Sequence, residues 1–423
     1  MTDTIFSPIR NATRKTQFFG WRFFNIYVLC VELNRGEYWR LGQFFQQLAK
    51  YNNFCYNIKQ IYIGELYMIR ERITKIQNEL SANSAFLVAS DKNRFYYTGF
   101  ESSAGAVLIT KNEAYFLIDF RYVEKAKATI TDCTVMLSSR TDEEIRQLCE
   151  KNGVKTIFFE TYSTSVSRLS ALKAALSGIE IVTDDKFDKL TEDMRAIKTS
   201  KELEYIKSAQ KMTDDTFSYI LERIEPGRTE RDIMLDMEFY MRRLGSEGVS
   251  FDFIVVSGKN SSLPHGVPTD KKVEKGDFIT MDFGAVCGGY HSDMTRTVAV
   301  GSVSEKQIEV YDTVLRAQLA AEKAVKAGAV CKDIDKIARD IIYSAGYEGC
   351  FGHGLGHSVG IEIHENPCFN TRCDAILRPG MILTNEPGIY IENEFGVRIE
   401  DMLYVTENGC QNLTKSDKKL IIL

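Results

Sequence analysis

The stretch DFITMDFGAVCGGYHSDMTRTVAVG (277–301) constrains the fold of this chain more than any other segment. It contains two β-like runs around a Gly-Gly pair at 288–289, which favours a tight two-residue hairpin turn. Because side chains alternate along a strand with a period of two, such a turn places Asp282 opposite Thr295 and Asp293 on the same face. Two neighbouring carboxylates repel each other, so the hairpin predicts a cation or a proton between them.

A second acid-bearing hairpin is predicted in TNEPGIYIENEFGVRIEDMLYV (384–405). Its turn at 392–396 brings Glu386 and Glu400 towards each other. Between the two hairpins lies FGHGLGHSVGIEIHE (351–365), which holds three of the five histidines of the chain. A single acid in an apolar strand is more often a hydrogen-bonded core or edge residue than a ligand. Four acids in two hairpins, with a histidine-rich loop between them, favour a metal site.

The donor set indicates which metal would bind. Four carboxylates and one imidazole form a hard, oxygen-rich ligand set. Such a set suits Mn²⁺ or another divalent first-row metal better than it suits a thiolate-type zinc site. Two metals roughly 3.5–4 Å apart, bridged by carboxylates, would balance this negative charge and activate a water molecule. The HGLGH segment does not fit a zincin helix, because no glutamate follows its first histidine and its two glycines disfavour a helix.

These residues together resemble the pita-bread metallopeptidases, the superfamily of methionine aminopeptidase, aminopeptidase P, prolidase and creatinase. The resemblance lies in five motifs, MDFG, HSDMTRT, GHGLGH, NEPGIY and GVRIED, and it covers the chain from about Met68. It implies two divalent metal ions, Mn²⁺ with Co²⁺ and Zn²⁺ as alternatives. The ligands that it implies are Asp282, Asp293, His357, Glu386 and Glu400.

The resemblance also implies catalytic roles. Asp293 and Glu400 would bridge the metals, and Glu386 would also carry the proton that the reaction transfers. Histidines stand at matching positions around the substrate, His265 in SSLPHGVPTD and His364 in IEIHE. They would donate hydrogen bonds to the scissile carbonyl and to the oxyanion that forms from it.

Three further residues are placed by the same motifs or by strand alternation. His353 resembles a histidine that lines the proline side of the substrate pocket. Arg398 shares a strand face with Glu400, so it would orient that carboxylate or bind a carboxylate of the substrate, unless it forms a plain surface salt bridge. His291 is one residue out of phase with Asp293, so alternation directs it to the other face and excludes it from the site.

The function that the resemblance implies is removal of the N-terminal residue from a peptide whose second residue is proline, as in aminopeptidase P. The main alternative is prolidase, which cleaves only Xaa-Pro dipeptides. A non-catalytic pita-bread module that binds protein or nucleic acid is less favoured, because such members lose metal ligands and this chain keeps all five. Relatives of this kind suggest a homodimer.

The length of 423 residues favours at least two domains of mixed α/β (α+β) structure. Residues 68–197 alternate between strand-like and helix-like segments and resemble the creatinase-type N-terminal α/β domain. Residues 198–423 form the predicted pita-bread catalytic domain. The charged segment 188–224 lacks Gly and Pro and predicts one long connecting helix, with the domain boundary near Lys198.

Local patterns predict the elements of the N-terminal domain. The aromatic run RFYYTGF (94–100) is typical of a strand, and a β-hairpin is predicted around 111–112. TDEEIRQLCEKNG (141–153) predicts a helix with a capping box formed by Thr141 and Glu144.

The first 67 residues differ in kind from the rest. They hold both tryptophans and eight Lys or Arg against four acidic residues. The apolar run at 23–31 is too short for a membrane span of about 20 residues, and no small-residue cleavage site follows it. We expect this extension not to belong to the native enzyme, with Met68 as its natural start and the opening of the amphipathic helix MIRERITKIQNEL.

Composition limits the partners and the compartment. A net charge of −5 and a pI near 5.8 argue against non-specific binding to nucleic acid or to an anionic membrane. Ten cysteines without a CxxC pair predict reduced thiols in the cytoplasm. Cys368 and Cys373, the closest pair, are given no metal role.

Overall fold

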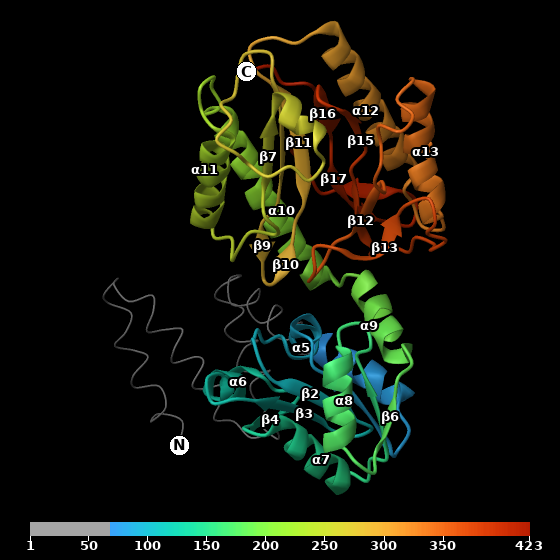
Figure 1. The fold of residues 1–423 in the computed structure, drawn as a ribbon. Coiled ribbons are helices and arrows are strands. Elements are labelled where there is room, and N and C mark those ends of the chain that lie inside the picture. The colour runs from blue at the N-terminus through green and yellow to red at the C-terminus, as the bar shows by residue number, and fades with distance from the viewer. Residues whose placement is uncertain (1–67) are drawn as a thin grey trace, which may run out of the picture. The chain divides into compact units, whose positions relative to one another are not determined.

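The computed structural model describes residues 68–423, which lie within one compact unit. The expectations for residues 1–67 lie outside the described residues. The fold is mixed α/β, as predicted (Figure 1). A helix covers residues 68–79 and buries the predicted apolar positions Ile73 and Ile76. Within the described part of the chain, no helix is both long and apolar enough to cross a membrane.

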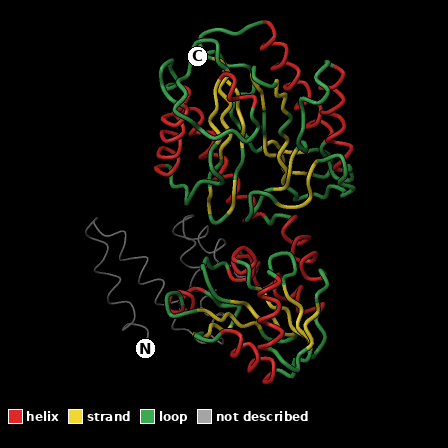
Figure 2. The backbone as a smooth tube through the Cα atoms, in the orientation of Figure 1, coloured by secondary structure: helices red, strands yellow, loops and turns green. Residues whose placement is uncertain are grey.

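A six-stranded sheet forms the core of the N-terminal half, in the order β4-β3-β2-β1-β5-β6, and only β2 runs antiparallel to its neighbours. Successive side chains of β1 point to opposite faces, so Phe86 packs in one apolar cluster with α5 and α9, and Leu87 packs in another with α7 and α8. Figure 2 shows helices around this sheet. The elements are β1 (Ser84–Val88), α5 (Asp91–Thr98), β2 (Ala106–Thr110), β3 (Ala114–Ile118), α6 (Val123–Thr129), β4 (Thr134–Leu137), α7 (Thr141–Lys151), β5 (Thr156–Phe159), α8 (Val166–Ala175), β6 (Glu180–Val182) and α9 (Lys186–Ala196).

The strand predicted at 94–100 is wrong, because this segment forms most of helix α5. The caps explain the difference: the Ser90 hydroxyl accepts a hydrogen bond from the Asn93 amide, and Gly99 ends the helix in the left-handed conformation. Aromatic residues favour strands only weakly, and Tyr97 is fully buried within the helix.

The capping box predicted for α7 is also wrong, although the helix itself is confirmed. Thr141 lies inside the first turn, and its hydroxyl is 2.9 Å from the Ser138 hydroxyl. Glu144 accepts hydrogen bonds from the amides of Ser139 and Arg140 instead.

The single helix predicted over 188–224 is two helices, α9 and α10 (Ser200–Leu221). They are separated at Ile197–Thr199 because Thr199 adopts an extended conformation and caps α10. A reciprocal capping box with Glu202 completes this cap. The break falls at Lys198, where the expected domain boundary lies.

The C-terminal half surrounds its strands with two pairs of helices, α10 and α11 on one side and α12 and α13 on the other (Figure 1). Its larger sheets have the orders β11-β8-β7 and β13-β12-β14-β17-β18, and β15 pairs with β16. The elements are α11 (Glu230–Arg243), β7 (Ile254–Ser257), η2 (Gly258–Ser262), β8 (Phe278–Phe283), β9 (Val286–Cys287), β10 (Tyr290–His291), β11 (Met294–Ala299), α12 (Glu305–Ala324), α13 (Cys331–Ser344), β12 (Gly356–Ser358), β13 (Glu365–Phe369), β14 (Ile382–Asn385), β15 (Gly388–Ile391), β16 (Phe395–Arg398), β17 (Asp401–Val405) and β18 (Cys410–Asn412).

Candidate metal centre

The first acid-bearing hairpin has the predicted register. Asp282 on β8 pairs with Thr295 on β11, and Asp293 lies directly before β11. Gly288 and Gly289 turn the chain with φ angles of 57° and 73°, values that side chains disfavour and a tight hairpin turn requires. The two aspartates are therefore held next to each other, Asp282 on β8 and Asp293 directly before β11.

The second pair of acids is held by the ladder between β14 and β17. Asn385 pairs with Asp401, so the residues just beyond them, Glu386 and Glu400, stand side by side. β12, which carries His357, pairs with β14 through Ser358 and Leu383. The register of one sheet thus brings the imidazole to the two glutamates.

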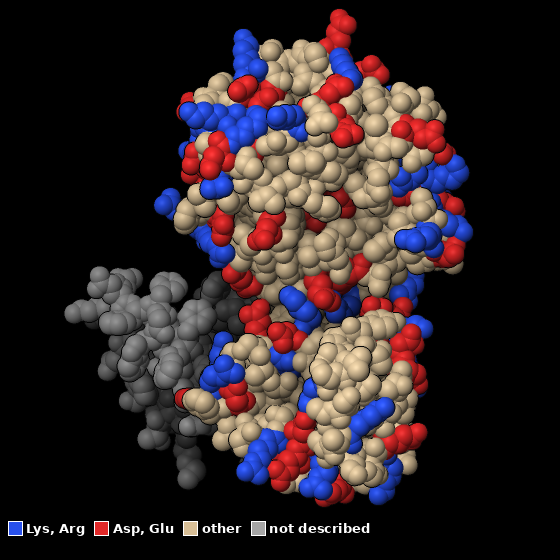
Figure 3. Space-filling model, viewed as in Figure 1, with Lys and Arg blue, Asp and Glu red and all other residues tan. Residues whose placement is uncertain are grey.

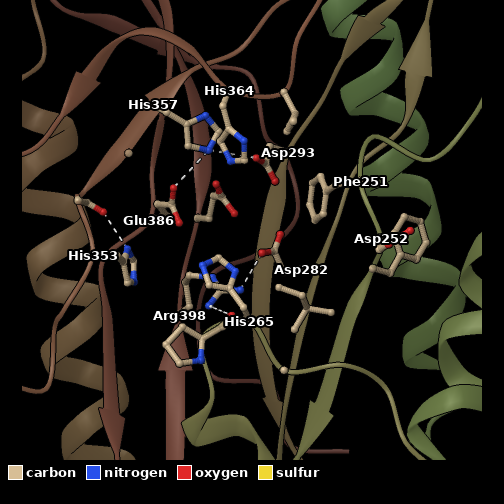
Figure 4. Close-up of a pocket in the computed structure, with 18 of the residues that line it drawn as sticks. Phe251, Asp252, His265, Asp282, Asp293, His353, His357, His364, Glu386 and Arg398 are labelled. Atoms are coloured by element: carbon tan, nitrogen blue, oxygen red, sulfur yellow. Dashed lines mark hydrogen bonds and ion pairs between the residues drawn. The ribbon is translucent and has the colours of Figure 1, made fainter. Parts of the chain in front are cut away.

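All five predicted ligands line one cavity of about 1030 Å³ (Figure 4). His357 Nε2 lies 3.6 Å from Asp293 Oδ2 and 3.5 Å from Glu386 Oε1. Ligand atoms of Asp293, His357 and Glu400 all lie within 4.8 Å of one another. This spacing is compatible with coordination of a common ion.

The carboxylates carry more negative charge than the protein balances. Burial, then the charges of Glu400, Asp282 and Glu386, raise the pKa of Asp293 well above its usual range. Burial and the acidic neighbours likewise raise the pKa of Glu400. Burial raises the pKa of Glu386 to about 8 even though Arg398 acts in the opposite direction.

Two oxygens of the cluster also lack a partner. Asp282 Oδ1 and Asp293 Oδ1 are buried and accept no hydrogen bond. Buried polar atoms are normally satisfied, and an unsatisfied one can mark the place of an ion. Surplus negative charge and free oxygen atoms are what a divalent cation would complete, so the residues present fit a metal.

His357 is in the form that a metal ligand requires. Burial lowers its pKa to about 4, with a further contribution from His364, so the ring is neutral at physiological pH. Nδ1 lies 3.2 Å from the Ser358 carbonyl and therefore donates to it. The lone pair is then on Nε2, the atom that faces the carboxylates.

Arg398 is buried, and its contacts are with the protein. Nη2 donates to Asp282 Oδ2 at 2.7 Å, and Nε donates to Thr295 Oγ1 at 2.9 Å. The salt bridge thus goes to Asp282 rather than directly to Glu400, and binding of a substrate carboxylate by Arg398 stays a prediction. Thr295 provides the connection to Glu400, because its hydroxyl donates to Glu400 Oε2 at 2.7 Å.

The three other predicted histidines line the same cavity. His265 is exposed in the loop after η2. The ring of His364 lies 4.4 Å from that of His357 in an edge-to-face arrangement. His353 lies 2.9 Å from the Tyr390 hydroxyl. His291, which alternation excluded, is buried 2.9 Å from Ser250 Oγ and is not among the residues that line the cavity.

Comparison with known proteins identifies the family. The family model of metallopeptidase family M24 matches residues 204–407, and that of the creatinase/prolidase N-terminal domain matches residues 72–197. The uncharacterized peptidase YqhT of Bacillus subtilis is 41% identical over 84% of this chain and 99% of its own. The chain belongs to metallopeptidase family M24.

Solved structures of related peptidases have the same fold as this M24 chain. The Xaa-Pro dipeptidase from Bacillus anthracis is 41% identical, with a TM-score of 0.80 over 85% of this chain and all of the other. The X-Pro aminopeptidase from Thermotoga maritima is 36% identical, with a TM-score of 0.77 over 82% of this chain and 99% of its own.

Two residues that contact the M24 site were not singled out from the sequence. Tyr390 accepts a hydrogen bond from Arg398 Nη1 at 2.8 Å and lies against His353. Arg296 is buried and donates to the backbone carbonyls of Thr295 and Glu400. The arginine of the TRT motif was visible in the sequence, but its backbone contacts depend on the tertiary packing of β11 against β17.

Proposed function

We propose that this chain is a dinuclear-metal Xaa-Pro peptidase that removes the N-terminal residue preceding proline, as aminopeptidase P does. The observation that carries the proposal is the convergence of Asp293, His357 and Glu400 within 4.8 Å, in a cavity that also contains the unpartnered oxygens of Asp282 and Asp293. The proposal is also supported by related peptidases, which are named as acting on Xaa-Pro substrates.

The metals would be held by the five predicted ligands, all of which line the cavity: Asp282, Asp293, His357, Glu386 and Glu400. His357 would bind through Nε2, and the four acids would bind through carboxylate oxygens. When bound, the ions lower the pKa of water towards neutrality and polarise the scissile carbonyl. Asp282 is oriented by Arg398, which leaves the second oxygen of Asp282 directed into the cavity.

The chain's own groups then bind the substrate and move the proton. The free α-amino group is held among the carboxylates, which fixes where the chain is cut. His265 and His364 donate hydrogen bonds to the carbonyl that precedes proline and stabilise its developing negative charge. Glu386 accepts a proton from the attacking water and delivers it to the leaving proline nitrogen.

The leaving group needs a shaped pocket, because the nitrogen of proline carries no hydrogen within a peptide and its ring is rigid. His353 lines the proline side of the cavity. Burial, with Arg398 next, lowers the pKa of His353 to about 4, so the ring is neutral. It donates from Nδ1 to the Gly354 carbonyl and accepts from the Tyr390 hydroxyl, which fixes its orientation.

A second candidate is a strict Xaa-Pro dipeptidase. The 41% identical structure from Bacillus anthracis carries that name, which favours it. The cavity of about 1030 Å³ has room for a peptide longer than two residues, as the first candidate requires. The two candidates share one chemistry and differ only in substrate length.

The test uses the protein loaded with Mn²⁺, with Co²⁺ and Zn²⁺ in parallel, and four peptides: Ala-Pro, Ala-Pro-Gly-Gly, Ala-Ala and Ala-Ala-Gly-Gly. We expect cleavage of both proline peptides and little cleavage of the alanine peptides. Cleavage of Ala-Pro alone selects the dipeptidase. Metal-loaded protein that cleaves neither proline peptide contradicts the proposal.

The proposal extends to metal, assembly and compartment. We take Mn²⁺ as the native metal, a homodimer as the assembly and the cytoplasm as the compartment, with residues 68–197 and 198–423 as the two domains. Metal analysis of protein purified without added ions and light scattering test the first two, and cell fractionation tests the third.

A non-catalytic binding module is the remaining rival. On the face drawn in Figure 3, basic and acidic side chains are interspersed, so that face gives no support to nucleic-acid binding. Asp293→Ala should lower the bound metal. Unchanged metal content in this variant would favour the binding module.

A further inference from the structure

A buried cluster of three charged side chains lies beside the cavity. Lys198 Nζ donates to Glu365 Oε2 at 3.0 Å, and Arg195 donates to Glu365 Oε1 from Nε at 3.2 Å and from Nη2 at 2.5 Å. The side chains of Arg195, Lys198 and Glu365 are only 8%, 1% and 5% exposed. We refer to these residues as the Glu365 cluster.

The cluster joins two distant parts of the chain. Arg195 lies at the end of α9 and Lys198 in the break before α10, whereas Glu365 opens β13 directly after His364. Arg195 also connects the cluster to α5, because its Nη1 donates a hydrogen bond to Asn93 Oδ1 at 3.0 Å. The segment that carries His364 is therefore anchored to α9 and α5 rather than only to its own sheet.

The loop before His364 is closed tightly around the Glu365 carboxylate. The Glu362 amide donates to Glu365 Oε1 at 3.2 Å, and Arg195 Nη2 donates to Glu362 Oε2 at 2.6 Å. A Cβ atom added to Gly360 would meet the Glu365 carboxylate at 2.4 Å, so the carboxylate fills the space inside the loop. The Gly360 carbonyl is in turn held by the His291 amide at 2.9 Å.

The energetics of buried charge explain why such a cluster matters for geometry. Removing three charges from water costs about as much as their attraction returns, so apolar residues of similar volume would often give equal stability. What apolar residues do not give is a directed contact to each oxygen of Glu365. Compared with an apolar replacement of the whole cluster, the ion pairs therefore contribute position more than stability, whereas removal of one member alone is destabilising.

We propose that Arg195 and Lys198 are positioning residues for His364, acting through Glu365. They fix the start of β13 and hence the ring of His364, which faces the cavity beside His357. This inference rests on the proposed function, because it assigns to His364 the hydrogen bond to the substrate carbonyl. It makes α9 and the connection to α10 part of what positions the catalytic groups.

The test is a double-mutant cycle between the cluster and His364. Lys198→Met, Glu365→Gln and the double variant Lys198→Met/Glu365→Gln are made with and without His364→Ala, and kcat and KM are measured on Ala-Pro-Gly-Gly and Ala-Pro with metal-loaded enzyme. We expect kcat to fall about tenfold or more in the presence of His364, with KM changed less than twofold. In the His364→Ala background the same changes should lower kcat by less than about twofold, because the effects of coupled residues are not additive.

The double variant keeps the test informative if a single change prevents folding. Lys198→Met alone leaves a buried carboxylate with fewer partners, whereas Lys198→Met/Glu365→Gln removes both charges. The NMR signals of the histidine rings give a second measurement without catalysis, since the chain has only five histidines. We expect the His364 ring signals to shift in the cluster variants while the His265 signals stay in place.

Lys271→Met is the control. It removes another partly buried ion pair by the same Lys-to-Met change, Lys271 Nζ to Asp277 Oδ2 at 2.7 Å, with side chains 24% and 15% exposed, and neither residue lines the cavity. We expect it to lower Tm and leave kcat within twofold. Equal losses of kcat with and without His364, or an unchanged His364 signal, would overturn the positioning role. Failure of the wild-type enzyme to cleave either proline peptide would instead reject the proposed function.

Discussion

Arg398 donates from Nη2 to Asp282 Oδ2 at 2.7 Å, while Asp282 Oδ1 is buried without a hydrogen-bond partner. One oxygen of this carboxylate is thus bound by the protein, and the other is available to a metal ion. Arg398 also donates to Thr295, which holds Glu400, so one guanidinium connects acids from both hairpins.

Replacement of Arg398 should therefore impair both metal binding and catalysis. Breaking a buried ion pair from one side costs about 3–5 kcal/mol, because the remaining charge stays buried. For Arg398→Met we expect kcat/KM to fall at least 100-fold, together with a lower bound metal content measured by elemental analysis. Lys306→Met, which removes an exposed ion pair with Glu394, should change neither quantity. Full metal content with normal kcat/KM in Arg398→Met would contradict the role given to this residue.

Removal of one acid should stabilise the metal-free protein. The pKa of Asp293 is raised by burial and then by Glu400, Asp282 and Glu386, which means that its negative charge is unfavourable without a cation. Asp293→Asn should therefore have a higher Tm than the wild type in the presence of a chelator. Added Mn²⁺ should raise the Tm of the wild type and have little effect on the variant, since an ion that binds only the folded state stabilises it. A lower Tm of the metal-free variant would indicate that this carboxylate stabilises the fold by itself.

Gly284 is needed for close backbone approach next to Asp282. A Cβ atom at this position would lie 1.8 Å from the carbonyl oxygen of Ser292, which is backbone and has little freedom to move. For Gly284→Ala we expect a loss of unfolding free energy of at least about 1–3 kcal/mol, measured by urea denaturation, with reduced metal content as the hairpin shifts. Gly248→Ala is the control, because nothing lies within 4 Å of its added Cβ. Equal stability of the two variants would exclude the steric reason.

The hairpin register shows how much the sequence could predict. A two-residue glycine turn and the period of two were sufficient to place Asp282 opposite Thr295, since both are local properties of the backbone. The motifs identified the acids and histidines that line the cavity because each motif is a short, local stretch of sequence. Roles of these residues in catalysis stay predictions.

One local prediction failed as well. The aromatic run of α5 suggested a strand because strand propensity was weighed above the Ser90 and Gly99 caps.

Contacts between distant segments could not be predicted from the sequence. The partner of Arg398 could not be chosen, because strand alternation gives the face of a residue but not the neighbour across the next sheet. Glu365 lies 170 positions from Arg195, and nothing in either local pattern indicates that they meet.

The Glu365 cluster predicts a pH dependence of stability. Burial opposes ionisation of Glu365, but the charges of Lys198 and then Arg195 lower its pKa to about 2 from an ordinary value of 4.5. A lowered pKa in the folded state means that the folded protein binds the proton less readily than the unfolded chain does. The resulting stabilisation is fully present above about pH 4.5 and is lost as the pH falls towards 2.

Urea unfolding of the wild type and Glu365→Gln between pH 6 and pH 3 measures this contribution, because all other carboxylates are common to the two proteins. We expect the wild type to be more stable by an amount on the order of 3 kcal/mol at pH 6, and the difference to shrink steadily below about pH 4.5. Glu394→Gln, which removes an exposed carboxylate, should differ little from the wild type at any of these pH values. A stability difference between the wild type and Glu365→Gln that stays constant down to pH 3 would mean that the ion pairs do not keep Glu365 ionised. The stability lost in Glu365→Gln would then come from packing or hydrogen bonding rather than from charge.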